Sequence, residues 1–240
     1  MSRGHLVGSA PRNGAPSPLA ILFDFGGTLD ADGVTWKARI RRLFAEEGVV
    51  PAASDFDRVF YAVDDALTGG IPSTLSLQET VSALTAGVAS GLGVRDAVVG
   101  DRVARRFVEA ALAHLRAHAP LLDRLRGRHA LGIVSNFYGN LEAVCSEAGM
   151  APFFRVLVDS TRVGCRKPDP RIFEAALKSL GVTPTRALFV GDSLARDMAG
   201  ARALGMPHVW LTLAPAPSDW PCCPGDRAVG ALADLEGILA

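Results

Sequence analysis

The chain carries one short segment on which the rest of the fold depends: Ile21-Leu22-Phe23-Asp24-Phe25-Gly26-Gly27-Thr28-Leu29. Its apolar start predicts a buried strand, and the two glycines after Asp24 predict a turn. In an open α/β sheet, ligands bind at the carboxyl ends of the strands. We therefore take Asp24 as the first candidate catalytic residue. This segment alone leaves open the alternative that Asp24 only accepts hydrogen bonds from the turn amides.

The composition limits the classes of function. Of the 240 residues, 49% are hydrophobic and 21% are charged, which is enough for a substantial core. Lys+Arg and Asp+Glu both number 25, and no basic run offers a surface for nucleic acid. No apolar segment approaches the ~20 residues that span a bilayer. We expect a cytoplasmic monomer or homodimer that binds neither nucleic acid nor a membrane.

The first half of the chain is predicted to be mostly helical. We interpret residues 1–18 as a flexible tail and residues 32–118 as an inserted helical bundle that follows the first strand. Apolar residues recur there at helical spacing, and Ser76-Leu77-Gln78-Glu79 forms a capping box. A fourth helix is expected from about Asp96 to His118, ending before Pro120.

The second half alternates strands with helices. Residues 19–31 and 119–240 are therefore predicted to form one core, with later strands near 130–134, 156–158, 187–190 and 208–213. A Pro-rich surface loop over 214–225 and a short strand and helix complete it. Such alternation is typical of a Rossmann-like, doubly wound parallel sheet. The predicted fold class is α/β, with the helical bundle as a cap.

Polar side chains follow several of these predicted strands: Asp24, Ser135-Asn136, Lys167, Asp192 and Asp197. The carboxyl ends of parallel strands meet at one edge, so these residues are expected to share a site. Asp24 and Asp192 could hold Mg²⁺, which prefers few carboxylates together with water and substrate phosphate. Ser135 and Asn136 could donate to phosphate oxygens, and Lys167 could neutralise charge on the attacking carboxylate.

With these residues in place, the sequence resembles the haloacid dehalogenase-like hydrolase superfamily. The resemblance covers about residues 19–213. The matching motifs are Asp24-Phe25-Gly26-Gly27-Thr28, Ser135-Asn136, Lys167-Pro168-Asp169-Pro170, and Gly191-Asp192-Ser193 with Asp197. The helical insertion resembles the cap that such enzymes place between their first two motifs.

The resemblance implies a role for each matching residue. Asp24 would be the nucleophile and a metal ligand, with Lys167 as its catalytic partner, and Ser135 and Asn136 would contact phosphate. Asp192 would bind the metal, and Asp197 would support it or form a second metal-site residue. The backbone carbonyl of Gly26 would also contact the metal, and Gly27 and Thr28 complete the expected phosphate contacts.

One position departs from the family pattern. Phosphatases of this family usually carry a second Asp two residues after the nucleophile, and here that residue is Gly26. The missing general acid–base is typically worth ~10²–10⁴ in rate, which is roughly 3–5 kcal/mol of barrier. Asp30 and Asp32 are the nearest substitutes, although solvated residues of the hinge are the simpler interpretation.

We therefore predict a Mg²⁺-dependent phosphatase of a small phosphorylated metabolite that acts through an aspartyl-phosphate on Asp24. Two alternatives stay open: a non-catalytic ligand- or partner-binding protein, and a 2-haloacid dehalogenase, against which Asp192 and Asp197 count. His114 and His118 lie one turn apart on a predicted helix. With no third ligand in view, we interpret them as core or solvated histidines rather than a metal pair.

Overall fold

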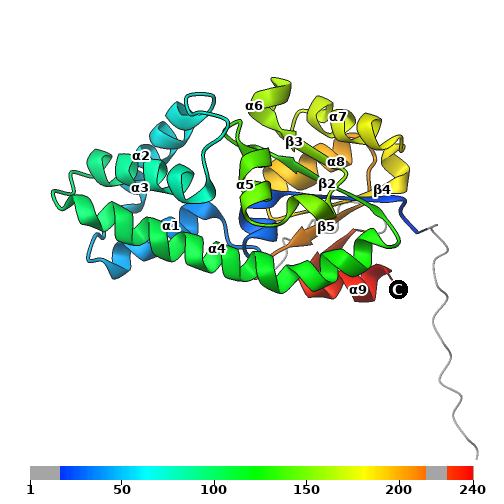
Figure 1. Cartoon of the computed structure of the whole chain (residues 1–240), viewed down its shortest axis with the longest axis horizontal. Coiled ribbons are helices and arrows are strands. Elements are labelled where there is room, and N and C mark those ends of the chain that lie inside the picture. Colours follow the sequence, from blue (N-terminus) through cyan, green and yellow to red (C-terminus); the bar gives the residue numbers. More distant parts are fainter. Residues whose placement is uncertain (1–16, 215–225, 240) are drawn as a thin grey trace, which may run out of the picture.

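The computed structural model describes residues 17–214 and 226–239. All but the last two residues of the expected N-terminal tail, and nearly all of the expected Pro-rich loop, lie outside these ranges. The molecule has two lobes, one built on a β-sheet and one built of helices (Figure 1).

The sheet lobe contains six parallel strands in the order β3-β2-β1-β4-β5-β6. They are β1 Ala20–Phe23, β2 Ala130–Ser135, β3 Val156–Asp159, β4 Ala187–Gly191, β5 His208–Leu211 and β6 Arg227–Val229. The predicted α/β fold with a parallel sheet is confirmed. Because β1 lies between β2 and β4, the residues that follow these three strands emerge side by side.

Helices cover both faces of the sheet because successive strand residues point to opposite sides. On one face, Ile21 and Phe23 pack with residues of α5 and of the C-terminal part of the chain. On the other, Ala20 and Leu22 pack against α7 and α8. The helices of this lobe are α5 Leu141–Glu147, α6 Ser160–Val163, α7 Pro170–Leu180, α8 Ala199–Ala203 and α9 Leu235–Leu239.

The helical lobe is inserted after β1. It consists of α1 Trp36–Glu46, α2 Ala53–Leu67, α3 Leu77–Gly91 and the first part of α4 Ala97–Arg126. The predicted capping box is present, since Ser76 accepts from the Glu79 N–H and the Glu79 carboxylate accepts from the Ser76 N–H. α4 runs along both lobes (Figure 1), so the expected limit of the insertion at residue 118 falls inside this helix.

The predicted end of the fourth helix before Pro120 is wrong. α4 begins after its N-cap Asp96, as expected, but continues through Pro120 to Arg126. A proline inside a helix costs about 3 kcal/mol. The continuation buries Leu121, Leu122 and Leu125 in the core, and burial of each leucine contributes about 1.5–3 kcal/mol. Tertiary packing therefore outweighs the local preference.

Candidate active site

Asp24 lies directly after β1 with one carboxylate oxygen fixed by three donors. Its Oδ1 accepts from the Phe25 N–H at 2.7 Å and from the Ser135 hydroxyl at 2.8 Å, and it pairs with Lys167 Nζ at 2.7 Å. The Asp24 backbone N–H in turn donates to the Val190 carbonyl of β4. Because Oδ1 is occupied, Oδ2 is the oxygen left to react.

Lys167 is a buried cation between two carboxylates. Its Nζ lies 2.7 Å from Asp24 Oδ1 and 2.7 Å from Asp197 Oδ1. Burial alone would lower the pKa of Lys167, but Asp197 and Asp24 raise it above its usual value. The lysine therefore stays charged and neutralises part of the negative charge around the nucleophile.

Asp192 differs from the other two carboxylates of the site. Both of its carboxylate oxygens are buried and lack a hydrogen-bond partner among the described residues. Burial raises the pKa of Asp192 to about 8, with further contributions from Asp24 and Asp197. An unpaired buried carboxylate of this kind is costly unless a cation or proton compensates it.

The acidic cluster fits a divalent cation. Asp24, Asp192 and Asp197 each place a carboxylate oxygen within 4.8 Å of the others. The oxygens of Asp197 are already engaged, by Lys167 and by the Ser193 N–H. Those of Asp192 are free among the described residues. An all-oxygen donor set with few carboxylates suits Mg²⁺.

Asn136 positions the lysine. Its side-chain Nδ2 donates to the Lys167 carbonyl at 3.1 Å, and its Oδ1 accepts from the Lys167 N–H at 2.7 Å. This pair of hydrogen bonds fixes the backbone from which Lys167 reaches Asp24. The amide expected to donate to phosphate is thus engaged with the backbone at residue 167.

Gly27 and Thr28 lie behind the site rather than on the cavity wall. The Gly27 N–H donates to Asp30 Oδ1 at 2.7 Å, and Thr28 is fully buried. Gly27 has a φ of +91°, and a Cβ there would overlap the Asp192 carboxylate. Glycine is therefore required for the close approach of this loop to Asp192.

Trp36 covers the position where the family usually has its second Asp. A Cβ on Gly26 would lie 3.0 Å from the indole Nε1 of Trp36. That Nε1 donates to Asp30 Oδ2 at 2.7 Å, and Arg39 also pairs with this oxygen. Asp30 is completely buried in this network. It is thus not a solvated hinge residue, and its carboxylate is committed to structural partners rather than to the leaving group.

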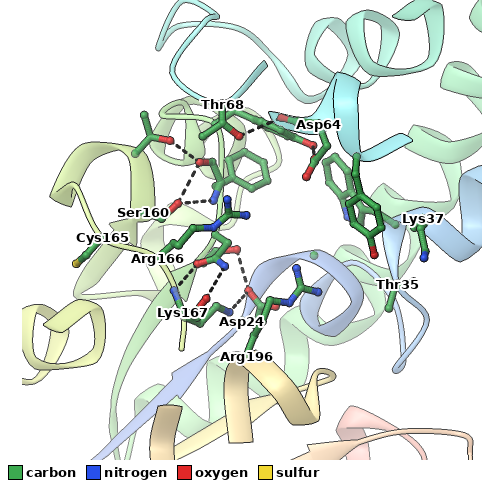
Figure 2. Close-up of a pocket in the computed structure, with 18 of the residues that line it drawn as sticks. Asp24, Thr35, Lys37, Asp64, Thr68, Ser160, Cys165, Arg166, Lys167 and Arg196 are labelled. Atoms are coloured by element: carbon green, nitrogen blue, oxygen red, sulfur yellow. Dashed lines mark hydrogen bonds and ion pairs between the residues drawn. The ribbon is translucent and has the colours of Figure 1, made fainter. Parts of the chain in front are cut away.

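A cavity of about 470 Å³ lies over Asp24 between the lobes. Figure 2 shows Asp24, Lys167 and Arg196 on its sheet side, facing Asp64 and Thr68 from the end of α2. Asp64 Oδ1 accepts from the Tyr138 hydroxyl at 2.5 Å. This hydrogen bond joins the helical lobe to the loop after β2.

The sequence did not identify most of the residues that line this cavity. Gly26, Ser135 and Asn136 line it as expected, but other residues of the helical lobe and of the loops facing it were missed: Thr35, Phe60, Tyr61, Asp64, Thr68, Ser160, Thr161, Arg166 and Arg196. Arg166 and Arg196 each precede a motif residue, which was the one available signal. For Tyr61 and Asp64, helical periodicity indicates the polar side of the helix but not which part of the molecule lies opposite it.

The molecule is an α/β protein with its candidate site between two lobes. The site's side chains lie at the carboxyl edge of the sheet, and the inserted helical lobe covers them. A family model of haloacid dehalogenase-like hydrolases matches residues 18–205. The chain belongs to this hydrolase family.

Curated relatives agree with this assignment. Over 89 residues the chain is 43% identical to haloacid dehalogenase-like hydrolase domain-containing protein 3 of Bos taurus, a match to 37% of this chain and 35% of that protein. It is 37% identical over 120 residues to a phosphoserine phosphatase of Thermus thermophilus, covering 50% and 48% of the two chains. The chain thus spans less than half the length of either relative. A pyrimidine 5'-nucleotidase of Escherichia coli is 30% identical over 72% of this chain and 77% of its own.

Solved structures show the same fold. A dehalogenase crystal structure with an intermediate complex has a TM-score of 0.65 at 22% identity, covering 93% of this chain and 98% of its own. The magnesium-bound HAD hydrolase YfnB of Bacillus subtilis has a TM-score of 0.57 at 20% identity, covering 93% and 99%. Among the described residues, no helix is both long and apolar enough to cross a membrane.

Proposed function

We propose that the chain is a Mg²⁺-dependent phosphatase of small phosphorylated metabolites that acts through an aspartyl-phosphate on Asp24. The observation that carries this proposal is the contrast between two carboxylates. Asp24 has one oxygen held by Ser135, Lys167 and a backbone amide. Asp192, beside it, has both buried oxygens without a hydrogen-bond partner in the described part of the chain. The phosphatase and nucleotidase relatives support the same reaction class.

In the proposed reaction, Asp24 Oδ2 attacks the substrate phosphorus. The bond between phosphorus and the leaving-group oxygen breaks, and its electron pair departs with that oxygen. Water then attacks phosphorus and gives up a proton to solvent, the bond between phosphorus and Asp24 Oδ2 breaks, and phosphate is released with the carboxylate restored. Lys167 and Ser135 hold Asp24 in position and offset the charge that develops. Mg²⁺ held by Asp24, Asp192 and the Gly26 carbonyl would supply positive charge to the phosphoryl oxygens.

The absent acid at position 26 sets the preferred leaving group. No side chain at Gly26 donates a proton to the departing oxygen, and Asp30 is engaged by Trp36 and Arg39. We therefore propose that phosphate esters whose alcohols leave readily as anions are favoured over alkyl and sugar phosphates. Residues 32–118 would act as the cap that closes over the cavity and selects the substrate.

The proposal is tested with Asp24→Asn, which keeps the size of the side chain and removes the nucleophilic oxygen. Hydrolysis of an aryl phosphate in Mg²⁺ should fall at least ~10³-fold, as expected when a nucleophile is removed. Asp101→Asn, an exposed carboxylate change on α4, is the matched control and should retain the parent rate. If Asp24→Asn keeps a rate near the parent's, the covalent mechanism is wrong.

A further inference from the structure

A second group of potential metal ligands lies where the helical lobe joins the sheet lobe. Asp32 is in the segment between the loop after β1 and α1, and His114 and His118 are one turn apart on α4. The three side chains place one ligand atom each within 4.8 Å of the others. None of them belongs to the acidic cluster at Asp24.

The orientation of His118 is fixed by a backbone group. Its Nδ1 lies 2.9 Å from the Leu29 carbonyl oxygen. Because a carbonyl only accepts, Nδ1 must carry the proton. In the neutral form of this tautomer the lone pair is on Nε2, and Nε2 lies 3.3 Å from Asp32 Oδ1. A backbone carbonyl that fixes the tautomer in this way is the usual support of a metal-ligating histidine.

The carboxylate is held from the other side. Asp32 Oδ1 accepts from the Leu232 N–H at 3.0 Å. His118 Nε2 and Asp32 Oδ1 thus face each other at 3.3 Å, a contact that either a proton on Nε2 or a cation shared by the two atoms makes favourable. His118 is only 7% exposed, so solvent offers this nitrogen little compensation.

One of the printed separations matches that of adjacent ligands around a tetrahedral ion, and the other is somewhat longer. With metal–ligand bonds of about 2.0–2.1 Å, tetrahedral geometry places neighbouring ligand atoms roughly 3.3 Å apart. The observed distance between His118 Nε2 and Asp32 Oδ1 is 3.3 Å, and His114 Nδ1 lies 3.9 Å from Asp32 Oδ2. The side chain of His114 is 40% exposed and that of Asp32 is 30% exposed. A small rotation of the His114 side chain would bring its Nδ1 to bonding distance from the ion. Water could then occupy the fourth coordination position.

We propose that Asp32, His114 and His118 form a binding site for a first-row transition ion of the zinc type, separate from the magnesium cluster. Two imidazoles and one carboxylate suit Zn²⁺ and its neighbours, whereas Mg²⁺ prefers oxygen ligands alone. A bound ion would connect α4 to the loop that follows β1. Through the Leu29 carbonyl this link continues to the segment that carries Asp24.

The test uses full-length protein without a histidine tag, carrying Asp192→Asn so that the magnesium cluster is disabled. Titration with Co²⁺ in excess Mg²⁺ should give the visible ligand-field absorption of a tetrahedral nitrogen–oxygen site, saturating at one ion per chain. Calorimetric titration with Zn²⁺ should give the same stoichiometry. At free Zn²⁺ 100-fold above the dissociation constant, the midpoint of thermal unfolding should rise by about 5–10 °C.

Variants of the ligands show whether this site is responsible. His114→Gln and Asp32→Asn, both at partly exposed positions, should weaken Zn²⁺ binding at least ~10-fold and abolish the cobalt spectrum. Glu109→Gln, an exposed change elsewhere on α4, should alter neither. The proposal is overturned if the Asp192→Asn protein takes up no Zn²⁺ or Co²⁺, or if His114→Gln binds them as tightly as its parent. Neither readout depends on phosphatase activity, so both stand whether or not the proposed function is correct.

Discussion

The indole of Trp36 governs what an acid at position 26 could do. A Cβ on Gly26 would meet its Nε1 and Cδ1 at 3.0 and 3.2 Å, while the backbone at Gly26 has an ordinary negative φ. The main chain therefore accepts Asp at this position, but its Cβ would crowd the aromatic ring, which must shift by a few tenths of an ångström.

We expect Gly26→Asp alone to narrow the preference for aryl over alkyl phosphates less than the double variant does, because Trp36 crowds the new side chain. Gly26→Asp combined with Trp36→Ala should narrow the ratio of the two kcat/KM values by about 10²-fold, since general acid catalysis is worth about that much. Trp36→Ala alone is the control for cavity enlargement. If the parent already hydrolyses both esters equally, another group supplies the proton.

Asp192 predicts how stability depends on pH. In the fold its pKa is raised to about 8 from 3.8, so between these values the folded chain keeps a proton that the unfolded chain releases. Stability of the metal-free protein therefore falls as pH rises through this window. Asp192→Asn should be more stable than the parent in EDTA at pH 8, by about 1–3 kcal/mol, and this difference should shrink as the pH is lowered toward 4.

Chemical denaturation with and without Mg²⁺ measures this effect. Mg²⁺ should raise the free energy of unfolding of the parent at pH 8 and leave Asp192→Asn unchanged, because the free carboxylate oxygens are gone. Lower stability of the metal-free variant at pH 8 would mean that Asp192 has a compensating partner.

At the residue scale, the sequence predicted the members of this cluster because each follows a strand. It could not predict that, of these three carboxylates, only Asp192 has neither a hydrogen bond nor an ion pair from the residues that the structure describes, since that depends on burial and neighbouring side chains.

Among the elements, α4 shows that tertiary packing can outweigh the local rule that a proline ends a helix. The sequence placed its start correctly at Asp96 but ended it before Pro120, whereas the helix extends to Arg126. The buried leucines beyond the proline continue the apolar face that includes Phe107 and Leu115. Periodicity across the proline was the missed signal.

Pro120→Ala should stabilise the protein. Pro120 is exposed and lacks the N–H that would donate within the helix, so its replacement recovers about 3 kcal/mol, less about 1 kcal/mol of added entropy in the unfolded chain. The midpoint of thermal unfolding should rise by about 4–8 °C. Ala117→Gly, exposed on the same helix, should lower it. No rise for Pro120→Ala would show that the helix has adapted to the proline at no cost.

For the molecule as a whole, the alternation of strands and helices was enough to predict the parallel sheet and the helical insertion. The convergence of Asp24, Ser135 and Asp192 followed from the rule for strand ends. The contacts between lobes did not follow, because they join residues without a shared pattern. Asp64 meets Tyr138 across the cavity, and Asp32 completes the pair of histidines on α4. Such pairings depend on how the two lobes are placed relative to each other, and helical periodicity carries no information about that placement.

The continuity of α4 has a mechanical consequence. Its 30 residues extend about 45 Å at 1.5 Å per residue, and the helix contacts α1 and α3 at one end and β2 at the other. One connection between the lobes is thus a continuous, stiff helix rather than a flexible linker. A bend of about 10° at Pro120, where the hydrogen-bond ladder lacks a donor, would swing the far end roughly 6 Å, given its distance of about 35 Å. Bending of α4 at Pro120, which lies outside the cavity, would then control access to Asp24.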